Sequence, residues 1–223
     1  MTDSFTSIAV CGFKRSSEII DCVYAERFPD GMSPEEEADR LLDYYLKLRC
    51  GYFAHDYGGA GYVRESVMRQ AGLPDTHVVP FTYTHSATKD VITYNPPSIT
   101  GIRHSYSIDK ARSLAVLCAM VRNGKVTLPE YNSTTSIPLD DLLALVENPK
   151  ELPRGNVLYL ITRAPKKPDD FAHALNYACS AIWHSRMAYP DLSAVSERFR
   201  ASKEALDLAV PPPPTTNPPS NAL

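Results

Sequence analysis

The chain lacks an excess of either charge. Its 223 residues include 23 lysines and arginines and 26 aspartates and glutamates, so its formal net charge is −3. Proteins that neutralise many nucleic-acid phosphates usually carry a basic footprint, so the overall charge counts modestly against nucleic-acid binding. Local basic clusters are present, and each is either part of a nucleic-acid track or ordinary solvated surface. They are Arg64 and Arg69, Arg103 and His104, Lys110 and Arg112, and Arg163 with Lys166 and Lys167.

Cysteine is sparse and follows no metal-binding pattern. The five cysteines are odd in number, form no CxxC pair and mostly have apolar neighbours. This distribution argues against a disulfide framework and against a zinc site built from paired cysteines. It predicts reduced thiols in the core. They are Cys11, Cys22, Cys50, Cys118 and Cys179.

Long apolar runs and nucleotide-binding motifs are also missing. No apolar run approaches the roughly 20 residues that span a bilayer, and no charged-then-apolar leader follows Met1. We therefore expect neither membrane insertion nor secretion. The glycines at 58–61 lack both the GxGxxG order and the Lys-Ser/Thr ending of a phosphate loop, so nucleotide binding is not expected there. No repeat of solenoid period is visible.

The pattern that remains is typical of a single α/β domain. Alternating apolar runs and capping signals predict strands at 6–13, 18–28, 52–56, 77–84, 91–94, 125–128 and 157–162, and helices at 34–49, 62–71, 108–123, 139–147 and 170–186. We assign residues 1–189 to the domain. Residues 190–223 are predicted to be a tail, with a helix at 193–209 and an extended proline-rich end at 211–220.

Paired carboxylates open the last helix of the domain. In residues 167–178 (KPDDFAHALNYA), a proline precedes Asp169 and Asp170, and apolar residues then recur at helical spacing. Either aspartate can cap the first N–H groups of the helix, which is the common role of an isolated pair. A fixed pair of carboxylates at a helix start can also bind a metal ion, and a second acidic element would favour that interpretation.

That element is residues 52–61 (YFAHDYGGAG), which read as a short strand with Asp56 at its end and a glycine-rich exit. Ligands of open α/β sheets bind at the carboxyl ends of the strands, where glycines allow the backbone to approach closely. His55 is predicted to point to the opposite face of the strand from Asp56 and to be a packed, structural histidine. Between the two acidic elements, residues 107–129 read as a helix with Ser107 as N-cap, followed at once by a strand.

Taken in this order, these segments resemble the nuclease domain of the large terminase subunit of tailed double-stranded DNA bacteriophages, which has an RNase H-like (retroviral integrase-like) fold. The likeness covers residues 4–184. In that family the middle helix is followed by an Asn-Gly-Lys turn and a Leu-Pro strand end, and the closing helix begins with carboxylates before an Ala-Leu-x-Tyr-Ala run. This chain has each of these features, at 123–125, 128–129 and 169–178.

The resemblance implies a mixed central sheet flanked by helices and a two-metal-ion DNA endonuclease that cuts concatemeric viral DNA. Asp56 and Asp170 would converge on two Mg²⁺ or Mn²⁺ ions, which prefer oxygen ligands. Asp169 would ligate as well or only cap. His173, Arg112 and Lys110 are possible DNA contacts, although His173 could instead orient a carboxylate. The implied partners are double-stranded DNA, a terminase ATPase domain, the small terminase subunit and the portal, in the cytoplasm of an infected host.

One departure from the family pattern concerns the opening strand. Members begin the domain with a strand ending in an Asp-Trp-Gly-like turn, whose aspartate is the first metal ligand, whereas residues 4–12 here resemble the next strand. Asp3 lies in the loop after the missing ligand and is a doubtful substitute. We therefore expect two inner strand edges to lie unpaired or to be forced together, and nuclease activity to be weak or absent. The alternatives are a resolvase- or transposase-type nuclease and a non-catalytic remnant or interaction module.

Overall fold

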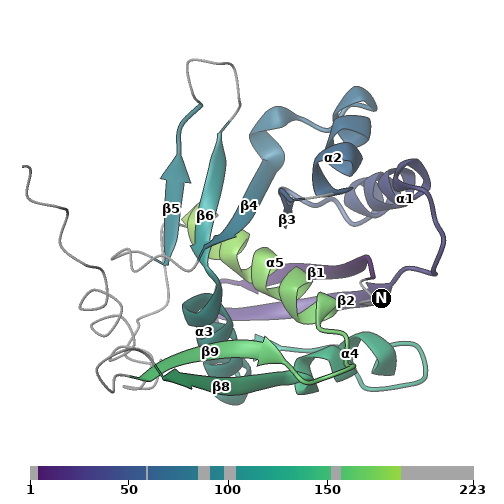
Figure 1. Ribbon diagram of the computed structural model, residues 1–223. Coiled ribbons are helices and arrows are strands. Elements are labelled where there is room, and N and C mark those ends of the chain that lie inside the picture. Colours follow the sequence, from purple (N-terminus) through teal and green to yellow (C-terminus); the bar gives the residue numbers. More distant parts are fainter. Residues whose placement is uncertain (1–4, 59, 85–90, 98–103, 152–156, 187–223) are drawn as a thin grey trace, which may run out of the picture.

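The computed structural model describes residues 5–58, 60–84, 91–97, 104–151 and 157–186. Its elements form three small sheets and five α-helices within these ranges (Figure 1). The helices are α1 (Pro34–Lys47), α2 (Ala60–Gln70), α3 (Lys110–Arg122), α4 (Ser136–Leu143) and α5 (Asp170–Arg186). The predicted tail helix at 193–209 and Asp3 lie outside the described residues. None of the described helices is both long enough and apolar enough to cross a bilayer.

The strands form two mixed sheets and one hairpin. The first sheet has the order β1 (Ser7–Lys14), β2 (Ile19–Arg27), β7 (Val126–Thr127), and the second has the order β3 (Phe53–Asp56), β4 (Val78–Thr84), β6 (Ser105–Asp109), β5 (Ile92–Asn95). The antiparallel hairpin joins β8 (Leu145–Glu151) to β9 (Val157–Arg163). β1 and β2 pair antiparallel, as their short connecting turn predicts.

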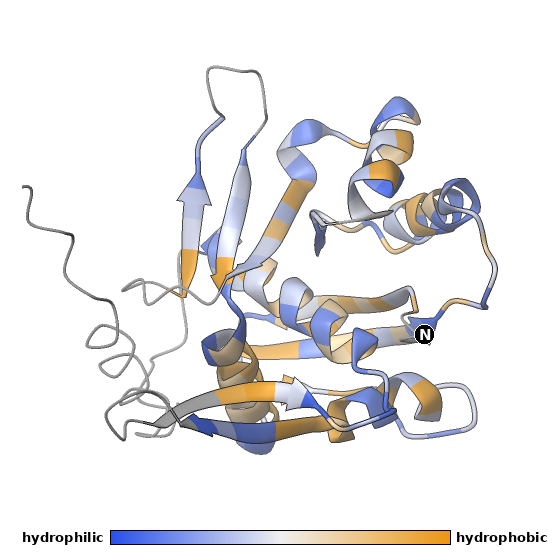
Figure 2. Ribbon diagram, viewed as in Figure 1, coloured by the Kyte–Doolittle hydropathy of each residue, from blue (hydrophilic) through white to orange (hydrophobic). Residues whose placement is uncertain are grey.

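Helix α5 packs against both the sheet that contains β1 and the sheet that contains β3 (Figure 1). Its apolar residues enter two core clusters, one with β2 and α3 and another with β4 and β6. Leu175 and Phe171 are fully buried in the first cluster, and Tyr177 stacks on Phe81 of β4 in the second. In Figure 2, apolar residues of β9 and α3 lie where these two elements overlap, and Ile161 of β9 packs against the first cluster.

Contacts along α5 show that β1 and β3 run in opposite directions. The N–H of Phe5, just before β1, donates to Asp170 at the start of α5, whereas Arg186 at the end of α5 lies over the ring of Phe13 near the end of β1. On the other side, Tyr83 at the end of β4 contacts His173 in the first turns of α5. β3 is parallel to β4. β1 therefore follows the direction of α5, and β3 opposes it.

Two predicted helices are shorter than expected because strand pairing takes part of each. The helix predicted at 108–123 begins only at Lys110, since the preceding residues form β6 between β4 and β5. Its N-cap is Asp109, whose side chain accepts from the N–H of Arg112, and not Ser107. The helix predicted at 139–147 ends at Leu143, and β8 then pairs with β9 along seven positions. The expected single central sheet is likewise divided, with β1 and β3 as separate edges.

Local signals at α1 are confirmed. Ser33 accepts from the N–H of Glu36 at 3.2 Å, and the Glu36 carboxylate accepts from the N–H of Ser33 at 2.8 Å, which completes a capping box, with Pro34 in the first turn.

Partial burial makes His184 a pH-sensitive element of the fold. Burial, with a smaller contribution from nearby His104, lowers the pKa of His184, whose ring lies 4.5 Å from that of Tyr106. Below the ordinary histidine pKa of about 6.5, the unfolded chain binds a proton that folded His184 does not. The free energy of unfolding should therefore fall as the pH drops from 7 toward the folded pKa.

Urea unfolding at pH 7.5 and 5.5 measures this effect. We expect His184→Gln to reduce the difference in stability between the two pH values. An unchanged difference would assign the acid sensitivity to other groups.

Candidate acidic site

A cavity of about 1220 Å³ lies between the edges of β1 and β3. Residues from both strands line it, and the His173–Ile182 portion of α5 contributes further lining. The cavity brings Asp56 together with Asp169 and Asp170, which lie more than 110 positions later in the chain. The strand end that carries Asp56 and the start of the last helix therefore both contribute to the lining of one cavity.

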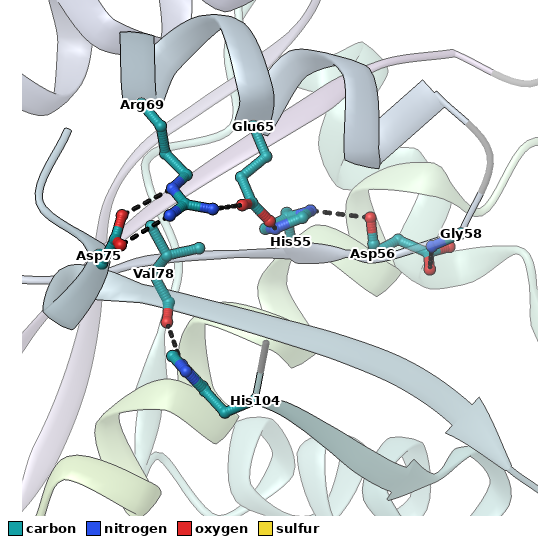
Figure 3. Close-up of polar contacts among 8 residues, drawn as sticks. All are labelled: His55, Asp56, Gly58, Glu65, Arg69, Asp75, Val78 and His104. Carbon is teal, nitrogen blue, oxygen red and sulfur yellow. Dashed lines mark hydrogen bonds and ion pairs between the residues drawn. The ribbon is translucent and has the colours of Figure 1, made fainter. Parts of the chain in front are cut away.

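Asp56 ends β3 and enters a tight turn. Its Oδ1 accepts from the N–H of Gly58 at 2.9 Å, an Asx-type contact that holds the carboxylate over the turn (Figure 3). The parallel pairing of β3 with β4 places Asp56 beside Phe81. The side chain is exposed. A carboxylate at this position can bind a cation from solution without a large desolvation cost.

His55 is held by a buried network behind Asp56 (Figure 3). Its Nε2 lies 2.7 Å from the carboxylate of Glu65 on α2, and its Nδ1 lies 2.8 Å from the backbone oxygen of Asp56. The backbone oxygen can only accept, so Nδ1 donates to it. Glu65 is 2% exposed, and Arg69 links it to Asp75. The prediction that His55 is a packed, structural residue is confirmed, and its network fixes the end of β3 against α2.

Gly61 is required for this close packing. A Cβ added at Gly61 would lie 1.8 Å from the backbone oxygen of Asp56 and 3.2 Å from Nδ1 of His55. We expect Gly61→Ala to lower the free energy of unfolding by about 1–3 kcal/mol, the usual cost of overpacking, despite the better helix propensity of alanine. Gly51→Ala is the matched control because a Cβ there meets nothing within 4 Å. Equal stabilities of the two variants in urea would contradict this prediction.

Asp169 belongs to a second polar network, at the start of α5. Its Oδ2 lies 2.9 Å from Nε2 of His173, and Nδ1 of His173 lies 2.9 Å from the hydroxyl of Tyr83. Burial raises the pKa of Asp169, but the hydrogen bond from His173 and the nearby charges of Lys110 and Arg163 outweigh it, so the pKa lies below its usual value. Of the two roles predicted for His173, the geometry supports that of orienting a carboxylate.

Tyr83 completes this network as a protonated phenol. Burial raises its pKa, and the charges of Asp56 and Asp169 add to the effect. Its hydroxyl accepts from the side-chain amide of Asn176 at 3.0 Å, so it can donate to Nδ1 of His173. Sequence reasoning did not identify Tyr83 or Asn176, because their contacts join β4 to α5.

Asp170 contacts the start of β1. Its Oδ2 accepts from the N–H of Phe5 at 3.1 Å. The N–H of Phe171, in the first turn of α5, is satisfied instead by Asp141 of α4, whose Oδ2 lies 3.0 Å away. The first turn of α5 is therefore capped by a residue outside the Asp169–Asp170 pair, and the Asp170 carboxylate contacts the segment before β1 instead. Asp141 was not identified from the sequence, where Asp140 and Asp141 gave only a weak signal as two acids in a short helix.

Basic residues reach the same region. Lys110 and Arg163 line the cavity and lie close enough to affect the pKa of Asp169. Arg64 also lines it, and its guanidinium contacts Glu37 and Thr6. Arg112, the other predicted contact on α3, does not line the cavity. The cavity lining is therefore mixed in charge.

The donor chemistry fits a hard divalent cation, but the number of ligands does not. Carboxylate oxygens are the ligands preferred by Mg²⁺ and Mn²⁺, and Asp56, Asp169 and Asp170 provide them around one cavity. Within the described ranges, however, no group of three or more His, Cys, Asp or Glu side chains is arranged to hold a metal ion. Asp56 and Asp170 would contribute to such a site, and it would need a further ligand.

Comparison with known proteins leaves the assignment open. No family model, curated protein or solved structure matches the chain significantly. Any function must therefore be argued from the cavity and its residues.

Proposed function

We propose that the chain is the nuclease part of a phage DNA-packaging terminase large subunit, a metal-dependent endonuclease that cuts concatemeric viral DNA. The main support is that Asp56 and the Asp169–Asp170 pair line one cavity although they come from opposite parts of the sequence. The resemblance in motif order supplies the family. Under this proposal the chain acts on double-stranded DNA in the host cytoplasm, with an ATPase domain, a small terminase subunit and a portal as partners.

The residues divide into distinct roles under this proposal. Asp56 and Asp170 would hold Mg²⁺ or Mn²⁺, which when bound activate water and stabilise the leaving oxygen of a phosphodiester. His173 orients Asp169 through the 2.9 Å contact, and Tyr83 fixes the ring of His173. Lys110 and Arg163 supply positive charge beside the carboxylates, where a DNA phosphate would otherwise be repelled.

Nicking of supercoiled plasmid DNA tests the proposal directly. The purified chain, incubated for long periods with 10 mM Mg²⁺ or Mn²⁺, is expected to convert supercoiled DNA slowly to open circles and to stop on addition of EDTA. Slow turnover follows from the incomplete ligand set. Cleavage that persists in EDTA, or that remains in an Asp56 and Asp170 double variant, would contradict it.

A second candidate is a catalytically incomplete module. The observation that favours it is the lack of a third metal ligand among the described residues. Calorimetric titration with Mn²⁺ separates the two: the nuclease proposal expects binding that weakens in Asp56→Asn, whereas an incomplete module expects no binding and no nicking. A resolvase- or transposase-type nuclease would cut branched or hairpin DNA in preference to linear duplex.

A further inference from the structure

The cavity described above has the features of a slot for an extended peptide. One wall is β1, an edge of the first sheet, and the opposite wall is β3, an edge of the second. Among the described residues no strand pairs with the outward side of either edge. Strand edges that present backbone N–H and C=O groups are templates for pairing with another segment.

Both faces of the slot are covered by helices. The α5 face is lined by small residues, Ala174, Ala178 and Ala181, which leave space above the helix. The other face is lined by α1 residues that include Leu41 and Tyr45. A strand held here would be buried on both faces, as the inner strands of α/β sheets are.

Apolar and polar groups along the slot lack the cover that such a strand would give. Val23, Leu48 and Tyr52 line the cavity and are 57%, 44% and 49% exposed. The hydroxyl of Ser7 also lines it, is buried, and has no hydrogen-bond partner within the described part of the chain. Exposed apolar side chains beside a buried, unpartnered hydroxyl indicate a surface that a ligand completes.

We propose that this slot binds an extended segment of a partner polypeptide, which enters between β1 and β3 as an added strand and joins the two sheets. The partner segment is apolar on both faces, with small side chains toward α5. Because β1 and β3 run in opposite directions, the added strand is antiparallel to one and parallel to the other. Antiparallel pairing is the more stable per residue, and β1 has eight residues against four in β3. The strand therefore runs antiparallel to β1.

A strand bound in this orientation would end at the acidic site. Phe5 lies beside Asp170, so a strand antiparallel to β1 ends at the start of α5. The carboxyl end of the bound segment would lie near Asp56 and Asp170, and its amino end near Phe13 and Arg186. Eight residues at about 3.3 Å each match the length of the β1 wall. The inference does not depend on nuclease activity, because strand addition requires neither metal nor DNA.

The probe is a fluorescein-labelled peptide of eight alternating valines and alanines with a Gly-Ser tail, used below the concentration at which it self-associates. We expect saturable binding by fluorescence anisotropy, together with slower hydrogen exchange of backbone amides in β1 and β3. The same peptide N-methylated at alternate residues loses its donors along one edge and should bind at least tenfold more weakly. Equal binding of the two peptides, or no saturable binding, would overturn the proposal.

Two protein variants test the location of the peptide. Ala178→Leu fills the α5 side of the slot and is expected to weaken binding at least tenfold. Ala119→Leu is the matched control, since Ala119 is a half-buried helical alanine of α3 that does not line the cavity. Melting curves check that both variants fold. If peptide binding is unaffected by Ala178→Leu, or if the edges become protected only as the protein dimerises, the slot does not take a partner strand.

Discussion

Asp56→Asn and Asp170→Asn are each expected to reduce metal-dependent nicking by at least about a hundredfold, the loss typical of removing one preorganised electrostatic group from an active site. Asparagine keeps the shape of the side chain and an acceptor oxygen, so Gly58 and Phe5 retain their hydrogen-bond partner. What is lost is the negative charge that a hard cation requires.

The fold should survive both substitutions. Both variants keep a hydrogen-bond acceptor for their backbone partners, so the melting temperature without Mg²⁺ should be nearly unchanged. Asp39→Asn is a suitable control, because Asp39 is an exposed aspartate of α1 that does not line the cavity. Unfolding of both variants in the absence of metal would identify Asp56 and Asp170 as structural residues instead.

Asp141→Ala should cause the largest loss of stability, about 3–5 kcal/mol, as is usual when one partner of a buried ion pair is removed. Asp141 is 1% exposed, forms an ion pair with Arg27 of β2 and accepts from the N–H of Phe171. The substitution leaves a mostly buried guanidinium and the first turn of α5 without an acceptor. Urea unfolding at pH 7 measures the change.

Two further variants test whether the buried ion pair causes the loss of stability. Asp140→Ala alters the neighbouring, exposed aspartate and should cost less than about 1 kcal/mol. Arg27→Met combined with Asp141→Leu removes both charges and should recover part of the loss, but not the contribution of the Phe171 hydrogen bond. If Asp140→Ala proved as damaging as Asp141→Ala, burial of the ion pair would not be the reason.

Elements with strong local signals could be predicted from the sequence. The bounds predicted for the last helix coincide with those of α5, and the capping box at Ser33 is present, because caps and helical spacing are encoded within a few residues. β6 and β8 could not be predicted, and the helices expected at 108–123 and 139–147 extend into them, because the conformation of both strands depends on pairing with β4 and β5 and with β9, which no local pattern reports.

The candidate site divides in the same way. Asp56 and the Asp169–Asp170 pair could be found from a strand end and a helix start. The partners that hold the network in place, Glu65 behind His55 and Tyr83 behind His173, could not, because each contact joins two elements whose packing is set by the whole core. The division of the central sheet at the β1 and β3 edges was expected only through the family resemblance.

The two elements that carry the acidic residues are held in the fold with different strength. Asp169 and Asp170 begin a 17-residue helix whose apolar side belongs to two core clusters, whereas Asp56 ends a four-residue edge strand tied to α2. The free energy needed to open an element locally is larger when the element packs into the core. Amides of α5 should therefore exchange only through global unfolding, and those of β3 through a smaller, more frequent fluctuation that separates Asp56 from the other carboxylates while the core stays folded.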